Sequence, residues 1–362
     1  MFASLPPDLK IIRSAGGLDS RNEPHPRPYY ASMPSLDGGD DTVIAMAKAV
    51  LASCRDCPPT IVFAAGPRFS NFVAALLIAR WAGAKLVLLY MDEWGVHTPP
   101  FVTVAENDTK WERRCLAAAD AICYVTEGKR AAYENAFPFL RNKVGRVFPN
   151  GWDPRAFSLA AMRTEHLQEH AGRFRISFVG RAAQHTPIEP FLDVLDEVFK
   201  LHPELSNVIR LLLIGNQLPS THRSMAAFDT RHPGTAQIMP AVPQNHAVEM
   251  MRESDALLLL NLTAYNGVIT QKTYDYLNVP KPILAFGAIS DAARLVEDAE
   301  AGVVVSDLTP LALTNALNTL LETPATRWDS ALRRRCAERY NRDHLAEDFI
   351  NFLLTLEKHN AE

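Results

Sequence analysis

The sequence has few cysteines, no excess of basic residues and no apolar run long enough to span a membrane. Five cysteines among 362 residues are too few, and odd in number, for a disulfide-stabilised secreted protein, so we expect a reduced chain. A net charge of −4 provides no general attraction for nucleic acid or for an anionic membrane. The beginning of the chain lacks the pattern of a secretory signal peptide. We therefore expect a cytoplasmic globular protein with no nucleic-acid partner.

Several motifs of well-known enzyme classes are also absent. The chain has no G-x-G-x-x-G, no Walker loop, no G-x-S-x-G and no D-x-D, the first three of which are typical of dinucleotide-binding proteins, P-loop proteins and α/β-hydrolases. Cys54-Arg-Asp-Cys57 is a single C-x-x-C, and a zinc site needs two further ligands. His166-Leu-Gln-Glu169-His170 matches the H-x-x-E-H of zinc peptidases. It lies in a polar connector that no strand precedes, so we keep a zinc peptidase only as an alternative.

The composition, with 48% hydrophobic and 22% charged residues, is typical of a globular protein with well-filled cores. The length favours two domains. Short apolar runs alternate with helical patterns, which indicates parallel sheets covered by helices. The predicted strands are 60–65, 85–91, 144–148, 175–180, 209–215, 255–262, 282–286 and 302–306.

The most informative stretch runs from Thr263 to Gly287. It begins as a polar loop at the carboxyl end of a buried strand, where open parallel sheets bind ligands. Gly267 lets the backbone approach a ligand closely, and the free N–H groups of a helix that begins near Gln271 favour an anion. Lys272 adds a positive charge, and Asp275 lies one turn further on the same face. A cation beside such amides suits a diphosphate, and a nearby carboxylate suits sugar hydroxyls.

The segment Lys272-Thr-Tyr-Asp275-Tyr-Leu-Asn-Val-Pro-Lys-Pro-Ile-Leu284 resembles K-x-x-E-Y-L-A-x-G-K-P-I-L, the donor segment of retaining family 4 of the GT-B glycosyltransferases. Two earlier segments resemble the same family in the same order. The first is A-D-A-I-x-x-V-T-E at 119–127, followed by P-N-G-x-D at 149–153. The second is F-V-G-R at 178–181. The resemblance implies a nucleotide-sugar-dependent transferase.

The resemblance also implies an α/β architecture of the GT-B type, with two Rossmann-like domains that face each other across a cleft. We expect an acceptor-side domain at 1–154, a linker at 155–172, a donor-binding domain at 173–325 and a helix at 326–362 that crosses back to the first domain. The short predicted strand Ile11-Ile12-Arg13 corresponds to the family's second strand. We therefore expect either that the first domain lacks its N-terminal strand–loop–helix unit or that the chain is a truncated part of something larger.

The resemblance assigns roles to several residues at the donor site. Arg181 would contact the donor phosphates with Lys272. The lysine that usually follows this arginine in the family is missing here, and His185, four residues further on, would substitute for it. Asp275 would orient the nucleotide ribose, and Gly267 replaces a glutamate of many members. The base would pair with the backbone of a short turn that contains Val242. The remaining donor-binding candidates are Gly215, Asn216, Val268, Ile269 and Thr270.

An acceptor site is predicted where the strand 85–91 delivers Asp92-Glu93-Trp94 to the sheet edge. The two acids would orient an acceptor hydroxyl, and the indole would stack on a sugar ring, with His97 as a further candidate. The alternative is a solvated loop whose tryptophan packs on its own domain.

The predicted reaction is the transfer of a sugar from a nucleoside-diphosphate sugar to a glycan or glycolipid acceptor, with retention, in surface polysaccharide or glycolipid biosynthesis. We expect no cofactor and no metal, because the D-x-D motif of metal-bridged donors is missing. Arg333-Arg334-Arg335 would form a solvated face or a contact with the inner membrane surface. A sugar-nucleotide epimerase of the same fold, or a non-catalytic donor-binding module, remains an alternative.

Overall fold

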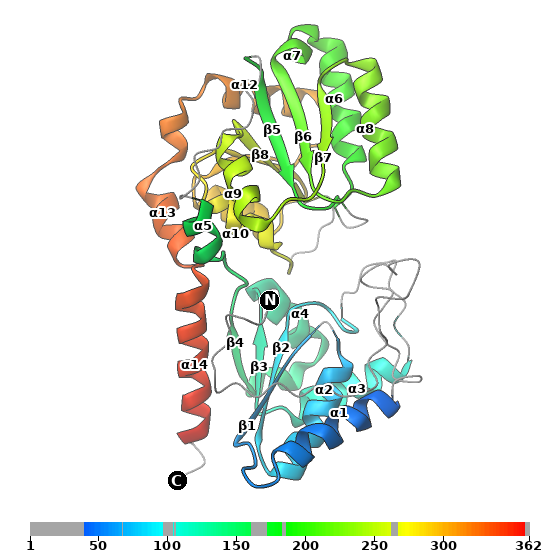
Figure 1. Ribbon diagram of the computed structural model, residues 1–362, viewed down its shortest axis with the longest axis vertical. Coiled ribbons are helices and arrows are strands. Elements are labelled where there is room, and N and C mark those ends of the chain that lie inside the picture. Colours follow the sequence, from blue (N-terminus) through cyan, green and yellow to red (C-terminus); the bar gives the residue numbers. More distant parts are fainter. Residues whose placement is uncertain are drawn as a thin grey trace. The chain divides into compact units, whose positions relative to one another are not determined.

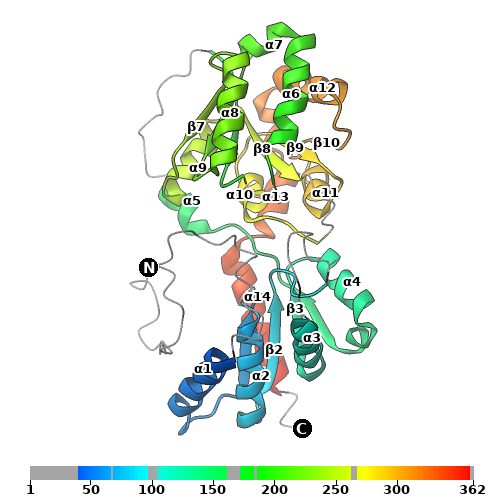
Figure 2. The same ribbon diagram turned by 90° about the vertical axis from the view of Figure 1, so that its right-hand side faces the viewer.

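The computed structural model describes residues 40–66, 68–96, 104, 106–160, 172–182, 186–261 and 267–358. The chain divides into two compact units, one made of Met1–Phe148 with Phe349–Glu362 and the other of Pro149–Asp348. Each unit contains one parallel sheet with helices packed on it (Figures 1 and 2). The predicted start of the first domain, including Ile11 to Arg13, lies outside the described residues.

The first unit is built on a four-stranded sheet in which strands follow one another in chain order. Its strands are β1 (Ile61–Ala65), β2 (Lys85–Tyr90), β3 (Ala121–Tyr124) and β4 (Val144–Val147). Its helices are α1 (Asp40–Ser53), α2 (Ser70–Ala82), α3 (Glu106–Ala118) and α4 (Glu127–Ala136), followed by the 3₁₀ turn η2 (Pro138–Asn142). All strands pair in parallel. The two central strands read as near-continuous apolar runs because both of their faces are covered.

Local signals in the sequence explain where two of these helices end or begin. Gly83 follows α2 in the left-handed conformation, with φ 66°, which glycine adopts without a steric cost. Thr126 precedes α4, and its hydroxyl accepts a hydrogen bond of 3.0 Å from the Lys129 amide. The last helix, α14 (Arg342–Lys358), completes this unit with its second half. There, Phe349 and Phe352 pack on Phe148 beside β2 and β3.

The second unit contains a six-stranded parallel sheet in the order β10-β9-β8-β5-β6-β7. Its strands are β5 (Phe174–Val179), β6 (Ile209–Ile214), β7 (Ala236–Met239), β8 (Ala256–Asn261), β9 (Ile283–Gly287) and β10 (Gly302–Val305). Counted within the unit, this is the order 3-2-1-4-5-6 of dinucleotide-binding folds. The prediction of a Rossmann-like second half is confirmed by this topology.

Helices cover both faces of this sheet. Successive residues of each strand point to opposite faces, so each strand contributes side chains to both apolar cores. Leu258 and Leu260 of β8 join one apolar core, and Leu257 and Leu259 join the other. The first core lies under α6 (Glu189–Leu201), α8 (Pro219–Arg231) and α12 (Pro310–Glu322). The second lies under α9 (Gln244–Glu253), α10 (Gln271–Leu277), α11 (Asp291–Asp298) and α13 (Ala331–Glu338). Shorter elements are α5 (Pro154–Ala160), α7 (Pro203–Val208) and η3 (Ala325–Trp328).

The segment after β4 groups with the second unit because its backbone pairs with the residues that precede α14. The Trp152 amide donates to the Tyr340 carbonyl at 2.8 Å, and the Arg342 amide donates to the Trp152 carbonyl at 3.1 Å. Gly151 has φ 63°, and a Cβ at this position would collide with the Tyr340 carbonyl oxygen. This contact explains the glycine of the predicted P-N-G-x-D turn.

The arginine run at 333–335 was predicted to form a solvated face, but one of its three side chains is buried. Arg333 is 1% exposed, and its guanidinium donates hydrogen bonds to the carbonyls of Leu277, Trp328, Ala301, Tyr276 and Val279. Burial lowers the pKa of Arg333 to about 10. Arg334 is exposed and pairs with Asp329 at 2.6 Å. Only part of the run therefore faces solvent.

The described helices include none that is both long and apolar enough to cross a bilayer.

Candidate functional site

The order of the strands in the second unit reverses between β5 and β8. Chain segments that leave two such neighbouring strands turn away from each other, which opens a crevice at their carboxyl ends. β5 ends at Val179 and is followed by Gly180 and Arg181, and β8 is followed by residues 262–270 and then by α10. The topology thus brings the predicted donor residues Arg181 and Lys272, 91 residues apart in sequence, to one edge of the sheet.

Two glycines allow the ends of β5 and β6 to approach closely. Gly180 has φ 121° and Gly215 has φ 142°, values that other residues rarely adopt. A Cβ on Gly215 would lie 2.6 Å from the Gly180 carbonyl oxygen. The Gly180 amide donates to the Ile214 carbonyl at 2.8 Å. Gly215, predicted as a donor-site residue, therefore has a structural reason to be glycine.

The side chain of Gln217 fixes the turn that carries Arg181. Its Nε2 donates to the Gly180 carbonyl at 2.7 Å, and its Oε1 accepts from the Ala182 amide at 2.9 Å. Arg181 lies between these two anchored residues, is exposed, and has no ion-pair partner within the described part of the chain. We did not identify Gln217 from the sequence, where only its place two residues after Gly215 could have suggested it.

Lys272 lies at the same edge, on the first turn of α10. Its Nζ is 3.9 Å from the centroid of the Phe178 ring and 3.5 Å from the position of a Cβ on Gly180. No carboxylate of the described residues pairs with it. Desolvation lowers the pKa of Lys272 from 10.5 to about 7. A cation that has lost water and gained only an aromatic ring is strongly stabilised by an anionic ligand.

Asp275 lies one turn beyond Gln271 on α10 and is 7% exposed. Burial raises its pKa to about 6, against the opposing effects of a hydrogen bond from Gln271 and of the Arg342 charge. Gln271 Nε2 donates to Asp275 Oδ1 at 3.2 Å. The helix is held to β5 by Tyr276, whose hydroxyl accepts from the Val179 amide at 2.8 Å. Asp275 is thus mostly ionised at neutral pH and fixed beside the crevice.

The remaining donor-binding candidates surround this edge or fall outside the described residues. Asn216 is exposed at the end of β6. Val242 and Ile269 pack on the apolar core under α9 and α10, and Thr270 Oγ1 lies 3.2 Å from Thr273 Oγ1. Gly267 and Val268 are half-buried ahead of α10, and His185 is not among the described residues. Their roles in donor binding stay predictions.

The predicted acceptor residues of the first unit are largely engaged within that unit. Glu93 is 6% exposed, and its Oε1 lies 3.0 Å from Nζ of the equally buried Lys129. Lys129 also donates to the Met91 carbonyl at 2.7 Å. This buried pair gives Glu93 a structural role in closing the loop after β2. Asp92 is half-buried, and its role as an acceptor-positioning group stays a prediction.

Trp94 belongs to the core of the first unit. The indole is 3% exposed and stacks on Phe69, with ring centroids 5.0 Å apart and planes 4° from parallel. It is therefore not available to stack on a sugar, and the alternative of a tryptophan that packs on its own domain is the one observed. His97 lies outside the described residues.

The structure gives no support to the metal-site alternatives within its described part. No cluster of three or more His, Cys, Asp or Glu side chains there could hold a metal ion. His166, Glu169 and His170 lie outside the described residues. Cys54 and Cys57 are free thiols.

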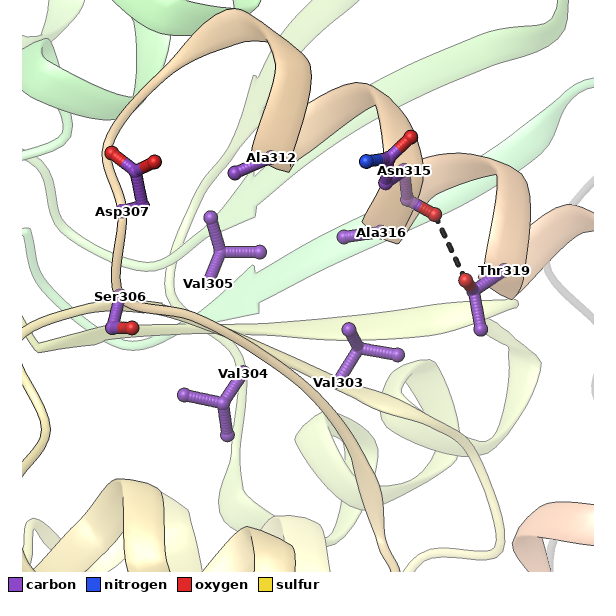
Figure 3. Close-up of a pocket in the computed structure, with 9 residues that line it drawn as sticks. All are labelled: Val303, Val304, Val305, Ser306, Asp307, Ala312, Asn315, Ala316 and Thr319. Atoms are coloured by element: carbon purple, nitrogen blue, oxygen red, sulfur yellow. Dashed lines mark hydrogen bonds between the residues drawn. The ribbon is translucent and has the colours of Figure 1, made fainter.

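A pocket of about 280 Å³ lies elsewhere in the second unit, between the edge strand β10 and α12 (Figure 3). Valines and alanines line its inner side, and Asp307 is its one charged residue. A diphosphate requires positive charge, which this pocket does not provide. The switch point between β5 and β8 is therefore the better candidate for an anionic ligand.

No protein-family model matches the sequence, and no curated protein matches it. The structure, in contrast, is similar to solved structures over most of its length. Sucrose-phosphate synthase from Thermosynechococcus elongatus superposes with a TM-score of 0.66 at 14% identity, over 90% of this chain and 82% of that chain. A UDP-forming α,α-trehalose-phosphate synthase from Burkholderia xenovorans superposes with a TM-score of 0.67 at 14% identity, over 87% of this chain and 78% of that chain. HepE from Anabaena, in complex with UDP and glucose, superposes with a TM-score of 0.64 at 14% identity, over 88% of this chain and 83% of that chain.

Identities this low establish a common fold. The likeness shows that the chain has the α/β GT-B fold that was predicted from its sequence. It does not single out retaining family 4 from other families of that fold.

Proposed function

We propose that this protein is a glycosyltransferase that moves a hexose from a nucleoside-diphosphate sugar to an acceptor hydroxyl. The observation that carries the proposal is Lys272, a desolvated cation without a carboxylate partner among the described residues, at the switch point of the second sheet. Ligands of such folds bind at this point, and a diphosphate supplies the missing negative charge. Among the structural neighbours, the trehalose-phosphate synthase is named as UDP-forming and HepE was solved with UDP.

The leaving group of the proposed reaction is the nucleoside diphosphate, on which negative charge grows as the bond to the sugar breaks. Lys272 and Arg181 would stabilise this charge from the ends of β8 and β5. The dipole of α10 contributes little, because the helix has only seven residues. The two cations therefore carry the electrostatic part of the proposal and would take the place of a metal ion.

Asp275 would accept hydrogen bonds from the ribose hydroxyls, a contact that a carboxylate forms more strongly than a neutral acceptor. The base would pair with backbone groups near Val242. Since such pairing uses no side chain, the identity of the base is open to experiment. The resemblance of the segment Lys272 to Leu284 to retaining family 4 supports retention at the sugar carbon. It also supports a glycan or glycolipid acceptor, met in the cytoplasm or at the inner membrane surface.

A second candidate is a donor-binding protein that does not transfer the sugar. Glu93 is neutralised by Lys129 and Trp94 is buried, so two of the predicted acceptor-site groups have structural explanations. Gly267 also stands where many family members carry a glutamate. Tight binding of a nucleotide sugar without release of its sugar would favour this candidate.

The test begins with binding of UDP, GDP, ADP and CDP, and of their glucose conjugates, by calorimetry and thermal shift. A ligand at a hundredfold excess over its Kd stabilises the protein by about 2.7 kcal/mol. Lys272→Met should abolish this stabilisation. The matched control is Lys281→Met, which removes the same charge at the amino end of β9, on the opposite edge of the sheet.

Transfer is then measured with the nucleotide sugar that binds, as release of nucleoside diphosphate in the presence of glycan and glycolipid acceptors. The anomeric configuration of the product distinguishes retention from inversion. Binding that survives in the Lys272→Met variant, or is lost equally in the Lys281→Met variant, would remove Lys272 from the donor site.

A further inference from the structure

The side-chain amide of Gln271, next to Lys272, uses both of its ends. Its Nε2 donates to the Gly151 carbonyl at 2.7 Å and to Asp275 Oδ1 at 3.2 Å. Its Oε1 accepts from Arg342 Nη2 at 2.7 Å. Each acceptor thus meets a donor, and the reverse orientation of the amide would place its oxygen against two other oxygens.

Arg342 fixes this orientation from the first turn of α14. Its Nε donates to the Gly151 carbonyl at 3.1 Å, and its Nη1 lies 4.0 Å from Asp153 Oδ2. An arginine has no acceptor, so its contact with the Gln271 amide holds only when the amide oxygen faces it. The amide nitrogen is then directed at Asp275.

This arrangement leaves Asp275 with one oxygen held and the other open for further bonds. Oδ1 accepts from Gln271, and among the described residues neither carboxylate oxygen of Asp275 has another hydrogen-bond or ion-pair partner. A fixed carboxylate with one open oxygen presents an acceptor in a defined direction. If the same aspartate could rotate, the oxygen would be spread over several directions and its contact with a ribose hydroxyl would weaken.

We propose that Arg342 and Gln271 are positioning residues that orient Asp275 toward the ribose hydroxyls of the donor nucleotide. The inference rests on the proposed function, since it names the part of the ligand that this group of residues recognises. It predicts that the beginning of α14, 67 or more residues beyond Asp275, determines how well the protein distinguishes ribose from deoxyribose.

The probe is a pair of ligands, UDP and 2′-deoxy-UDP, measured by calorimetry on the full chain. UDP is chosen because it is the nucleotide bound in a structural neighbour, with GDP and ADP and their deoxy forms as substitutes if the protein prefers another base. The native protein should bind the ribose form at least about tenfold more tightly, since a lost hydrogen bond to a charged group leaves that group unsatisfied. Asp275→Asn serves as the reference variant and should reduce this ratio to about one to three.

Two variants test the positioning residues separately. Arg342→Met should reduce the ratio to that of Asp275→Asn while the affinity for 2′-deoxy-UDP stays unchanged. Gln271→Glu keeps the size of the side chain but replaces the donor by an acceptor. It should likewise reduce the ratio and leave the affinity for 2′-deoxy-UDP unchanged. Arg342→Lys retains one donor for the Gln271 amide and should restore part of the ratio. Arg339→Met, which removes an exposed charge three residues earlier, should leave the ratio unchanged.

A merely structural role of Arg342 would give a different pattern. Both affinities would then fall together with the melting temperature, and the ratio would stay as in the native protein. That result, or an unchanged ratio in both Arg342→Met and Gln271→Glu, overturns the inference but leaves the proposed function in place. Failure of the native protein to bind any nucleoside diphosphate overturns both. If Arg342→Met does not fold, the Gln271→Glu variant decides the question alone.

Discussion

The two units present charged residues at the carboxyl edge of their sheets in opposite ways. In the first unit, Glu93 after β2 is paired with the buried Lys129 at 3.0 Å. In the second, Lys272 after β8 has lost water without gaining a carboxylate among the described residues. A buried charge with its own partner needs no ligand, whereas an unpaired one is stabilised when a ligand brings the opposite charge. The comparison supports a structural role for the Glu93–Lys129 pair at the first edge and agrees with the proposed role of the second edge in binding.

The largest effect is expected for Lys129→Met, which would leave Glu93 buried without a partner. Removal of one member of a buried ion pair destabilises a protein by about 3–5 kcal/mol. Urea unfolding measures this loss. The control is Lys110→Met, which breaks an exposed pair with Glu106 on α3 and should change the stability little. Equal effects of the two substitutions would show that the Glu93 pair is not structural.

A second prediction concerns the close approach of β5 and β6. Gly215→Ala should destabilise the second unit by about 2–3 kcal/mol, because a strained backbone costs about 1–3 kcal/mol and the new Cβ would lie 2.6 Å from the Gly180 carbonyl oxygen. Donor binding should weaken as well, since the new Cβ would displace Gly180 and Arg181 follows Gly180 in the chain. Gly83→Ala is the control.

Gly83 has φ 66° and no neighbour within 4 Å of a Cβ. Its replacement by alanine carries only the conformational cost, about 1 kcal/mol, and should not affect the donor. A Gly215→Ala variant as stable as the Gly83→Ala variant, with native donor affinity, would contradict the described approach of the two strands.

The third prediction concerns Lys272, whose replacement should stabilise the ligand-free protein, whereas replacement of Lys129 should destabilise it. Burial lowers the pKa of Lys272 from 10.5 to about 7, so the unfolded chain binds more protons than the folded chain between these pH values. Stability from this group therefore rises with pH across that range, and its penalty is complete below about pH 7. Lys272→Met removes the penalty and should stabilise the ligand-free protein by at least about 1 kcal/mol at pH 6, since one pKa unit corresponds to about 1.4 kcal/mol.

The measurement is urea unfolding of the native protein and the Lys272→Met variant at pH 6 and pH 9. The difference between them should shrink at the higher pH, because the native lysine is then neutral in the folded state. A variant that is less stable than the native protein at both pH values would mean that Lys272 is held by a favourable partner, and the contrast between the two units would be lost.

The contrast explains how much the sequence could predict. The strands were predictable because Leu257 to Leu260 and similar short runs are apolar on both faces, as in the strands of a parallel sheet that is covered on both sides. The position of Lys272 and Asp275 after such a strand followed from the same pattern. The GT-B fold predicted from the order of the motifs is confirmed by the structural likeness.

What the sequence did not predict are the partners that lie far apart along the chain. Glu93 and Lys129 belong to different elements, and their pairing depends on how α4 packs on the sheet. Gln271 and Arg342 are separated by 71 residues, and no local pattern connects them. The burial of Arg333 within a run of three arginines depends on the five carbonyls that surround it. In each case the role of a charged residue is decided by tertiary contacts rather than by its neighbours in sequence.

The smallest effect is expected for Gln217→Leu, which tests whether the edge of the second sheet is preorganised. Leucine removes the hydrogen bonds to the Gly180 carbonyl and from the Ala182 amide, each worth about 1 kcal/mol net. Water replaces part of them, because Gln217 is only half-buried.

The turn that carries Arg181 should therefore stay in place less of the time, and donor affinity should fall about threefold to tenfold, with little change in the free energy of unfolding. Gln237→Leu, which removes an exposed amide bonded to Arg210 on the same sheet, should leave donor affinity unchanged. Calorimetry with the bound nucleotide sugar measures both variants. An equal affinity of the Gln217→Leu variant and the native protein would mean that Arg181 needs no fixed turn, and that Lys272 alone distinguishes the second edge from the first.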